Sequence, residues 1–159
     1  MIIALTGHTK GLGAELYKDL THQYKVIGFS RSNGYDIKNP NDRKKIITES
    51  KDCDIFINLV HNYYHQTDIM YELYPSWENA EKLIINISSL VVDSKDWGID
   101  RLDYLQYKNQ KIALENMSSL LLSRHPKLQI KNYKISEINF DDDIKHLNSI
   151  INEFKISKK

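Results

Sequence analysis

The sequence predicts an α/β protein: one domain in which a doubly wound parallel sheet of about six strands carries helices on both faces. Short, nearly continuous apolar runs alternate with segments of helical periodicity, as in a parallel sheet connected by crossover helices. The chain has 159 residues, which suits a single hydrophobic core.

The expected strands are the apolar runs bounded by turn residues. They cover residues 2–6, 25–30, 54–59, 83–88 and 128–135, with a short additional strand at 35–37.

Helices are expected where apolar residues recur every three or four positions, as Leu12, Leu16 and Leu20 do. The expected helices cover residues 12–22, 66–74, 102–123 and 141–154, and one more begins at Pro40. Pro75 should end or interrupt the helix at 66–74, because proline has no N–H to donate. Three aspartates at 141–143 open the last helix, and we interpret them as capping residues rather than as a metal site.

Composition limits the classes of partner. Lys and Arg number 22 and Asp and Glu 21, so a formal charge of +1 gives no overall attraction to nucleic acid or anionic lipid. A single cysteine, Cys53, excludes an internal disulfide and favours a reduced, cytoplasmic setting. No apolar run is long enough to cross a bilayer, and we expect no leader before the strand that starts at Ile2.

A glycine-rich turn, TGHTKGLG at residues 6–13, joins the first strand to the first helix. Glycines let the backbone approach a pyrophosphate closely, and the helix N-terminus offers N–H groups and a positive dipole end. Ordinary tight turns also use glycine, but this position in an alternating chain favours a dinucleotide site. The candidate ligands in the turn are Gly7, Thr9, Lys10, Gly11, Leu12 and Gly13.

The glycine spacing in this turn is Gly-x-x-x-Gly-x-Gly, with a threonine before the first glycine. It resembles the short-chain dehydrogenase/reductase family, whose usual turn reads Thr-Gly-x-x-x-Gly-x-Gly. The resemblance implies a Rossmann-type fold that binds a nicotinamide dinucleotide.

The end of the second strand suggests which dinucleotide binds. A site selective for NAD places an acidic residue there, whereas this chain has Ser30 and Arg31. A guanidinium binds a 2′-phosphate as a fork, and Lys10 supplies a second positive charge. In the family that the chain resembles, basic residues at these two places accompany NADP(H) preference; the alternative is that both are ordinary solvated surface charges.

Three further residues resemble the family's cofactor contacts. Asp36 and Ile37 resemble an Asp-hydrophobic pair beside the adenine ring. Asn58 matches the first asparagine of the family's Asp-Ile-Leu-Val-Asn-Asn-Ala-Gly strand end.

Catalytic candidates follow the fourth long apolar run. INISS at residues 85–89 resembles the family's Asn-x-Ser-Ser strand end, which makes Ser89 the catalytic serine; a serine-rich turn is the alternative interpretation. Two Tyr-x-x-x-Lys pairs then overlap, each on one helical face: Tyr107 with Lys111 and Tyr104 with Lys108. We prefer Tyr107 and Lys111, because the residues after Lys111 resemble the small and apolar continuation in the family.

These residue types suit carbonyl reduction. A free tyrosine has a pKa of about 10, and a lysine ammonium one helical turn away favours the tyrosinate. Tyr107 would therefore act as acid and base, Lys111 as its activator and ribose anchor, and Ser89 as hydrogen-bond donor to the carbonyl oxygen.

The resemblance covers residues 1 to about 138 and has gaps. Leu59, Val60 and His61 replace Asn-Ala-Gly, and no catalytic asparagine can be assigned, with Asn62 only a guess. The chain ends early, so the substrate-binding end of the domain is truncated. His61 and His65 have a spacing compatible with a metal site on a helix, but with no evident third ligand we expect polar or substrate-facing histidines and no metal.

The sequence therefore predicts a cytoplasmic, NADP(H)-dependent carbonyl reductase or alcohol dehydrogenase that acts on a small molecule. The long helix at 102–123 resembles the one that forms family dimers, so a homodimer or homotetramer is expected. The alternative is a non-catalytic NADP(H)-binding or sensor protein with a degenerate family fold.

Overall fold

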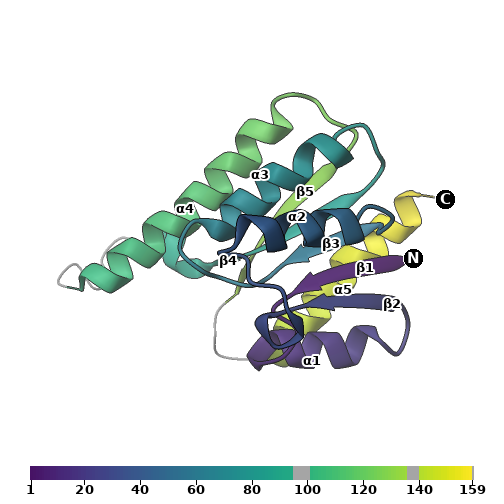
Figure 1. The fold of residues 1–159 in the computed structure, drawn as a ribbon, viewed down its shortest axis with the longest axis horizontal. Coiled ribbons are helices and arrows are strands. Elements are labelled where there is room, and N and C mark those ends of the chain that lie inside the picture. Colours follow the sequence, from purple (N-terminus) through teal and green to yellow (C-terminus); the bar gives the residue numbers. More distant parts are fainter. Residues whose placement is uncertain (95–100, 136–139, 159) are drawn as a thin grey trace.

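Five parallel strands form one sheet at the centre of the computed structural model, which describes residues 1–94, 101–135 and 140–158 (Figure 1). The strand order is β2-β1-β3-β4-β5, so the chain winds outward from β1 in both directions. This is the doubly wound α/β fold that the sequence predicts. The strands are β1 (Ile2–Thr6), β2 (Lys25–Phe29), β3 (Ile55–Asn58), β4 (Leu83–Ser89) and β5 (Gln129–Ile135).

The helices lie close to where the apolar periodicity places them, with ends that differ by a few residues. They are α1 (Gly11–Leu20), α2 (Pro40–Glu49), α3 (His65–Trp77), α4 (Leu102–Leu122) and α5 (Phe140–Ser157), with short 3-10 helices η1 (Arg31–Asn33) and η2 (Leu90–Asp93).

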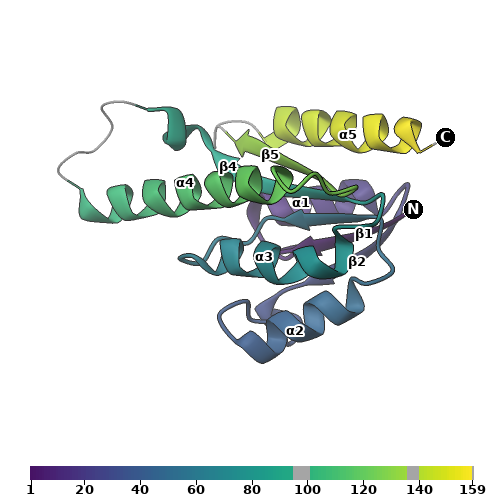
Figure 2. The same cartoon turned by 90° about the horizontal axis from the view of Figure 1, so that it is seen from above.

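Alternate strand residues supply the two halves of the core. On one face Leu5 and Ile57 pack with Leu16 of α1 and Leu147 of α5. On the other face Phe56 and its neighbours pack with α2, α3 and α4. Figure 2 shows α5 on one side of the sheet and α2 and α3 on the other. Successive strand side chains point to opposite faces, so helices on both sides bury the central strands β1, β3 and β4, whereas the edge strands β2 and β5 are partly exposed.

The prediction of a short strand at 35–37 is wrong, and the described sheet has five strands rather than six. Gly34 turns the chain with a φ of 92°, and the Tyr35 N–H donates to the Ser30 carbonyl instead of to a neighbouring strand. Ile37 is buried in the core beneath this loop. The apolar residue therefore covers the sheet without joining it.

Pro75 neither ends nor interrupts α3, contrary to expectation, because the helix continues to Trp77. Proline removes the bond that its missing N–H would make, yet the Glu78 N–H still donates to the Tyr74 carbonyl at 2.8 Å. Trp77 is fully buried and meets Phe56 edge-on, with 6.3 Å between ring centroids. Packing of this large aromatic ring stabilises the last helical turn, which includes Pro75.

An asparagine row crosses three neighbouring strands, from the last residue of β3 to the middle of β4 and β5. Asn58, Asn86 and Asn132 are aligned in register. Asn58 Nδ2 donates to Asn86 Oδ1 at 2.9 Å, and Asn86 Nδ2 donates to Asn132 Oδ1 at 3.1 Å. Ser118 of α4 donates to the same Asn132 oxygen at 2.9 Å. These bonds supply partners to polar groups in the interior and fix α4 over the sheet.

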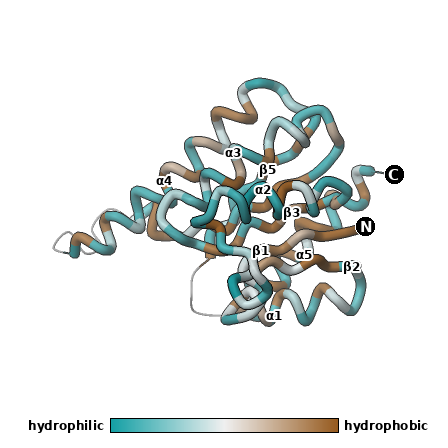
Figure 3. The backbone as a smooth tube through the Cα atoms, in the orientation of Figure 1, coloured by the Kyte–Doolittle hydropathy of each residue, from teal (hydrophilic) through white to brown (hydrophobic). Residues whose placement is uncertain are grey.

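Hydropathy follows this layering. In Figure 3 the chain of β1 is brown, whereas brown and teal alternate along α1 and α4, as expected of amphipathic helices. None of the helices in the described residues combines the length and apolar character needed to cross a membrane.

Replacing Leu147 by alanine should destabilise the protein by about 2–4 kcal/mol, because its fully buried side chain fixes α5 to the sheet. Urea denaturation measures the change. Ile156→Ala on the same helix is the matched control, since Ile156 is 70% exposed, and it should leave stability almost unchanged. Equal losses in the two variants would contradict the assigned core.

Candidate active site

Two adjoining clefts lie beside the carboxyl ends of the strands. The first has a volume of about 620 Å³ and the second about 280 Å³, and His61 and Asn62 line both. The other residues of the first cleft are Gly7, Thr9, Lys10, Phe29, Ser30, Arg31, Ser32, Tyr35, Asp36, Ile37, Leu59 and Val60. The second cleft is completed by Tyr63, Asp103, Gln106, Tyr107 and Gln110.

The glycine turn brings β1 and α1 unusually close together. A Cβ on Gly13 would lie 2.0 Å from the Gly7 carbonyl oxygen, so no side chain fits there. Gly7 itself has a φ of 79°, which favours glycine. The Thr6 hydroxyl oxygen accepts bonds from the N–H groups of Leu59 and Val60, at 3.0 and 3.2 Å. The turn after β1 and the loop after β3 therefore form one continuous wall of the first cleft.

The N-terminus of α1 opens toward this cleft. Lys10 occupies the N-cap position, and its side chain makes no capping hydrogen bond. The first N–H groups of a helix have no partner within the helix. Together with the helix dipole they favour a bound anion beside Gly7, Thr9 and Lys10, which line the cleft.

A small hydrogen-bonded loop presents Arg31. Asn33 Oδ1 accepts the Ser30 N–H at 2.8 Å, and Asn33 Nδ2 donates to the Gly28 carbonyl at 2.8 Å. These bonds fix η1, so the exposed Arg31 lies on the same cleft as the exposed Lys10. Sequence reasoning missed Asn33, although asparagine three residues after a serine is a recognisable capping signal.

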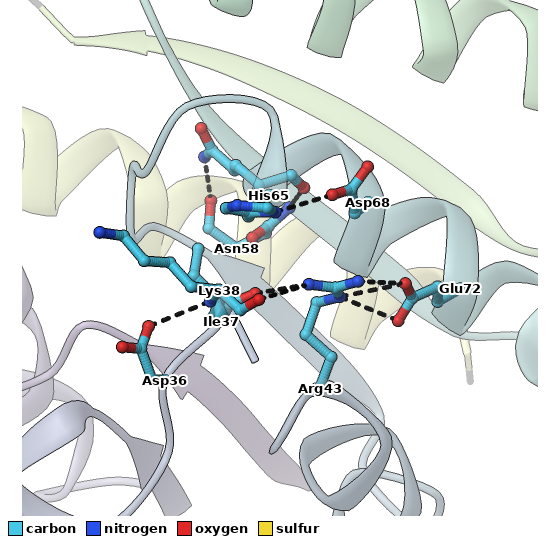
Figure 4. Close-up of polar contacts among 9 residues, drawn as sticks. Asp36, Ile37, Lys38, Arg43, Asn58, His65, Asp68 and Glu72 are labelled. Carbon is cyan, nitrogen blue, oxygen red and sulfur yellow. Dashed lines mark hydrogen bonds and ion pairs between the residues drawn. The ribbon is translucent and has the colours of Figure 1, made fainter. Parts of the chain in front are cut away.

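The far wall of the first cleft is held by an ion pair from α2 to α3 (Figure 4). Arg43, 7% exposed, contacts Glu72 at 2.8 Å and donates from Nη1 to the Ile37 carbonyl at 2.8 Å. The Glu72 carboxylate raises the pKa of Arg43. Asp36 accepts the Lys38 N–H at 3.0 Å in the same loop. The ion pair therefore positions Asp36 and Ile37 without being part of the cleft lining.

Seven of the residues that the sequence assigns to the cofactor converge on the first cleft: Gly7, Thr9, Lys10, Ser30, Arg31, Asp36 and Ile37. Gly11, Leu12 and Gly13 form the first turn of α1. Asn58 is fully buried and donates to the carbonyl of Gln66 at 2.8 Å, so it supports the site through α3.

Tyr107 and Lys111 lie one turn apart near the start of α4. The Lys111 ammonium lies 5.6 Å from the centroid of the Tyr107 ring. Lys111 is 3% exposed, and its Nζ donates to Gln66 Oε1 and to the Ile87 carbonyl, both at 2.8 Å. A buried ammonium needs such acceptors, and it keeps a positive charge beside the phenol.

The alternative pair occupies another part of the helix surface. Lys108 Nζ donates to the Ser94 carbonyl, and the Tyr104 hydroxyl lies 3.4 Å from Ser94 Oγ. Tyr107 lines the second cleft, whereas the linings of the two described clefts include neither Tyr104 nor Lys108.

Ser89 ends β4 and serves as the N-cap of η2. Its Oγ accepts the Val91 N–H at 3.3 Å, and the residue is 5% exposed. Because the oxygen accepts this bond, the hydroxyl proton remains available for donation. In the described part of the chain, the linings of the two clefts do not include Ser89.

His61 packs against Tyr107, edge to face, with 4.8 Å between ring centroids and an interplanar angle of 86°. His61 as a whole residue keeps solvent exposure, yet its ring is partly desolvated. This desolvation and the nearby Lys111 charge lower the pKa of His61 from 6.5 to about 4, against opposing hydrogen bonds with Gln110 and Gln66. The imidazole is therefore neutral at neutral pH.

Gln66 connects the strand ends to the lysine. Its Nε2 donates to the carbonyls of Asn58 and Ile87, at 2.7 and 3.0 Å, while its Oε1 accepts from Lys111. Gln66 was assigned no role from sequence, and His61 was expected only as a polar or substrate-facing histidine. The partners of both residues are distant along the chain, so no local motif shows these contacts.

The two histidines of the possible metal motif do not share a helical face. His65 is the first residue of α3, and its Nδ1 lies 2.9 Å from Asp68 Oδ2, whereas His61 lies in the preceding loop and contacts Tyr107 (Figure 4 shows His65). Within residues 1–94, 101–135 and 140–158, no three His, Cys, Asp or Glu side chains are grouped to hold a metal ion.

Solved structures with this fold are short-chain dehydrogenases. A Burkholderia cenocepacia short-chain dehydrogenase in complex with NADP has a TM-score of 0.67 and 19% identity, covering 82% of this chain and 69% of that one. The 3-alpha-hydroxysteroid dehydrogenase of Pseudomonas sp. B-0831, complexed with NADH, has a TM-score of 0.65 and 14% identity. The match covers 86% of this chain and 72% of that one. An oxidoreductase (short chain dehydrogenase/reductase) from Brucella ovis has a TM-score of 0.64 and 15% identity. The match covers 95% of this chain and 91% of that one.

The chain has the short-chain dehydrogenase/reductase fold. No family model matches its sequence, and no curated protein matches it. The likeness therefore lies in the three-dimensional arrangement, at identities too low to transfer an activity.

Protonation of His61 should destabilise the protein in acid. Its pKa is about 4 when folded and near 6.5 when unfolded, so the unfolded chain binds the extra proton between these values. The free energy of unfolding should therefore fall, as the pH drops from about 6.5 to about 4, more steeply for the wild type than for His61→Gln. Urea denaturation across this pH range measures both, and parallel pH profiles would contradict the assignment.

Proposed function

We propose that this protein is an NADP(H)-dependent oxidoreductase of the short-chain dehydrogenase/reductase type that acts on a small carbonyl or alcohol substrate. One observation carries the proposal. A cleft with a glycine turn and two basic residues at one end adjoins a second cleft that contains a tyrosine beside a buried lysine. Structures of the same fold with bound NADP support the assignment.

The residues of the first cleft fit the 2′-phosphoadenosine half and the pyrophosphate of the dinucleotide. The missing Cβ of Gly13 permits the close turn beneath a pyrophosphate, and the α1 N-terminus faces that position. Arg31 and Lys10 would bind the 2′-phosphate, and Ile37 would cover the adenine ring. When bound, the nicotinamide supplies or accepts a hydride.

Residues of this chain would transfer the proton that accompanies the hydride. Tyr107 would donate its hydroxyl proton to the substrate oxygen during reduction and recover it in the opposite direction. The Lys111 ammonium, held by Gln66 and the Ile87 carbonyl, stabilises the tyrosinate form. Ser89 would donate its hydroxyl proton toward the substrate oxygen as charge develops there.

The proposal predicts that NADPH binds more tightly than NADH and that Arg31→Asp abolishes the difference. The change replaces a guanidinium by a repelling carboxylate, so NADPH affinity should fall about 10- to 100-fold. Isothermal titration calorimetry measures both cofactors. Arg124→Asp, an equal charge change on an exposed arginine at the end of α4, is the control. Equal affinities of the wild type for the two cofactors would overturn the NADP(H) assignment.

Tyr107→Phe should reduce NADPH-dependent carbonyl reduction by about 100-fold or more, because general acid catalysis contributes about 10²–10⁴-fold. NADPH oxidation with a panel of aldehydes, ketones and quinones measures the rate. Tyr104→Phe is the matched control from the other Tyr-x-x-x-Lys pair and should keep most of the activity. Loss of activity in Tyr104→Phe alone would reassign the acid to that residue.

A non-catalytic NADP(H)-binding protein is the second candidate function. The observation that favours it is the burial of Lys111, which is 3% exposed and already engaged by two acceptors. Tight NADPH binding without turnover of any substrate in the same panel would favour this candidate over the reductase.

A further inference from the structure

His61 stands at the boundary between the two clefts. It lines the first cleft, where Lys10 and Arg31 lie, and it also lines the second, where Tyr107 lies. A molecule that extends from the basic residues to the tyrosine must therefore pass the His61 side chain.

The His61 ring occupies the space beside the tyrosine. Its centroid lies 4.8 Å from that of Tyr107, with the rings nearly perpendicular. Two aromatic rings at this separation are in van der Waals contact, so no third ring fits between them. Gln110 of α4 lies with His61 and Tyr107 in the lining of the second cleft.

The Lys111 side chain is also buried when the His61 ring lies against Tyr107. Its ammonium donates to Gln66 and to the Ile87 carbonyl and is almost inaccessible to solvent. The ammonium and the His61 ring both lie beside the Tyr107 ring, at 5.6 Å and 4.8 Å from its centroid. A sugar hydroxyl that bonds to this ammonium would need the space that His61 and Gln66 now occupy.

We infer that His61 determines how much of the dinucleotide the site accepts. This inference rests on the proposed function. With the imidazole against Tyr107, the first cleft takes the 2′-phosphoadenosine half and the pyrophosphate, while the nicotinamide half is excluded. The nicotinamide reaches Tyr107 only when the His61 side chain rotates away.

The side chain is suited to such a movement. It lies in the loop between β3 and α3 and keeps solvent exposure, so the ring can turn outward without opening the core. The imidazole is neutral at neutral pH, and its neighbour Lys111 repels rather than attracts a protonated ring. The contact that the rotation must break is the edge-to-face contact with Tyr107.

Calorimetric titration with two probes tests the inference. Adenosine 2′,5′-bisphosphate represents the half that fits the first cleft, and NADPH represents the whole cofactor. In the wild type we expect NADPH to bind no more than a few-fold more tightly than the bisphosphate. His61→Ala should tighten NADPH binding by about tenfold, which is about 1.4 kcal/mol, and leave bisphosphate binding unchanged.

His61→Phe is the matched variant, because it keeps a ring against Tyr107 and should bind both probes as the wild type does. The fluorescence of NADPH supplies an independent measurement, since it reports burial of the nicotinamide ring. We expect it to rise on binding to His61→Ala more than on binding to the wild type.

Two results would overturn the inference while leaving the proposed function intact. One is a wild type that binds NADPH far more tightly than the bisphosphate, with no change in His61→Ala. The other is an equal effect of His61→Ala on both probes. If neither probe binds any variant, the cofactor assignment fails, and the inference fails with it.

Discussion

The close contact between Gly13 and the Gly7 carbonyl is the constraint on which the rest of the site depends. Because neither residue has a Cβ, the N-terminus of α1 can lie directly against the end of β1. The Thr6 hydroxyl then ties the loop after β3 to the same point. A side chain at residue 13 would separate α1 from the sheet and remove the anion-binding wall of the first cleft.

Polar groups in the interior perform the second structural task, which is to hold α3 and α4 at the carboxyl edge of the sheet. Gln66 joins the ends of β3 and β4 to Lys111, and Asn86 joins its neighbours in the asparagine row to Ser118. Buried polar groups stabilise a single arrangement only when they find partners. The same bonds that fix these helices also bury the ammonium that the proposed chemistry requires, so structure and reactivity share one network.

Much of the fold could be predicted from the sequence because its signals are local. Buried strands such as β1 and β3 are almost continuous apolar runs, and the spacing of leucines on α1 marks its buried face. The glycine turn could be recognised for the same reason, since Gly7 and Gly13 lie six positions apart. The 35–37 segment was predicted wrongly because the turn at Gly34 and the bond from the Tyr35 N–H to the Ser30 carbonyl take the chain away from the sheet. Pro75 was predicted wrongly because Trp77, beyond it, packs against Phe56, which is distant in the chain.

The sequence by itself therefore determined the α/β class, the glycine turn after β1 and the Tyr-x-x-x-Lys pairs, because each is carried by residues near one another in the chain. The assignment of that turn, with Lys10 and Arg31, to a dinucleotide stays a prediction. A cytoplasmic setting and a homo-oligomer stay predictions. Only the tertiary structure decided that His61 contacts Tyr107 and that Gln66 bonds to Lys111. Each of these contacts joins residues about 45 positions apart, and packing of α3 and α4 on one sheet edge brings them together. Contacts of this kind leave no periodicity or spacing for a sequence to show.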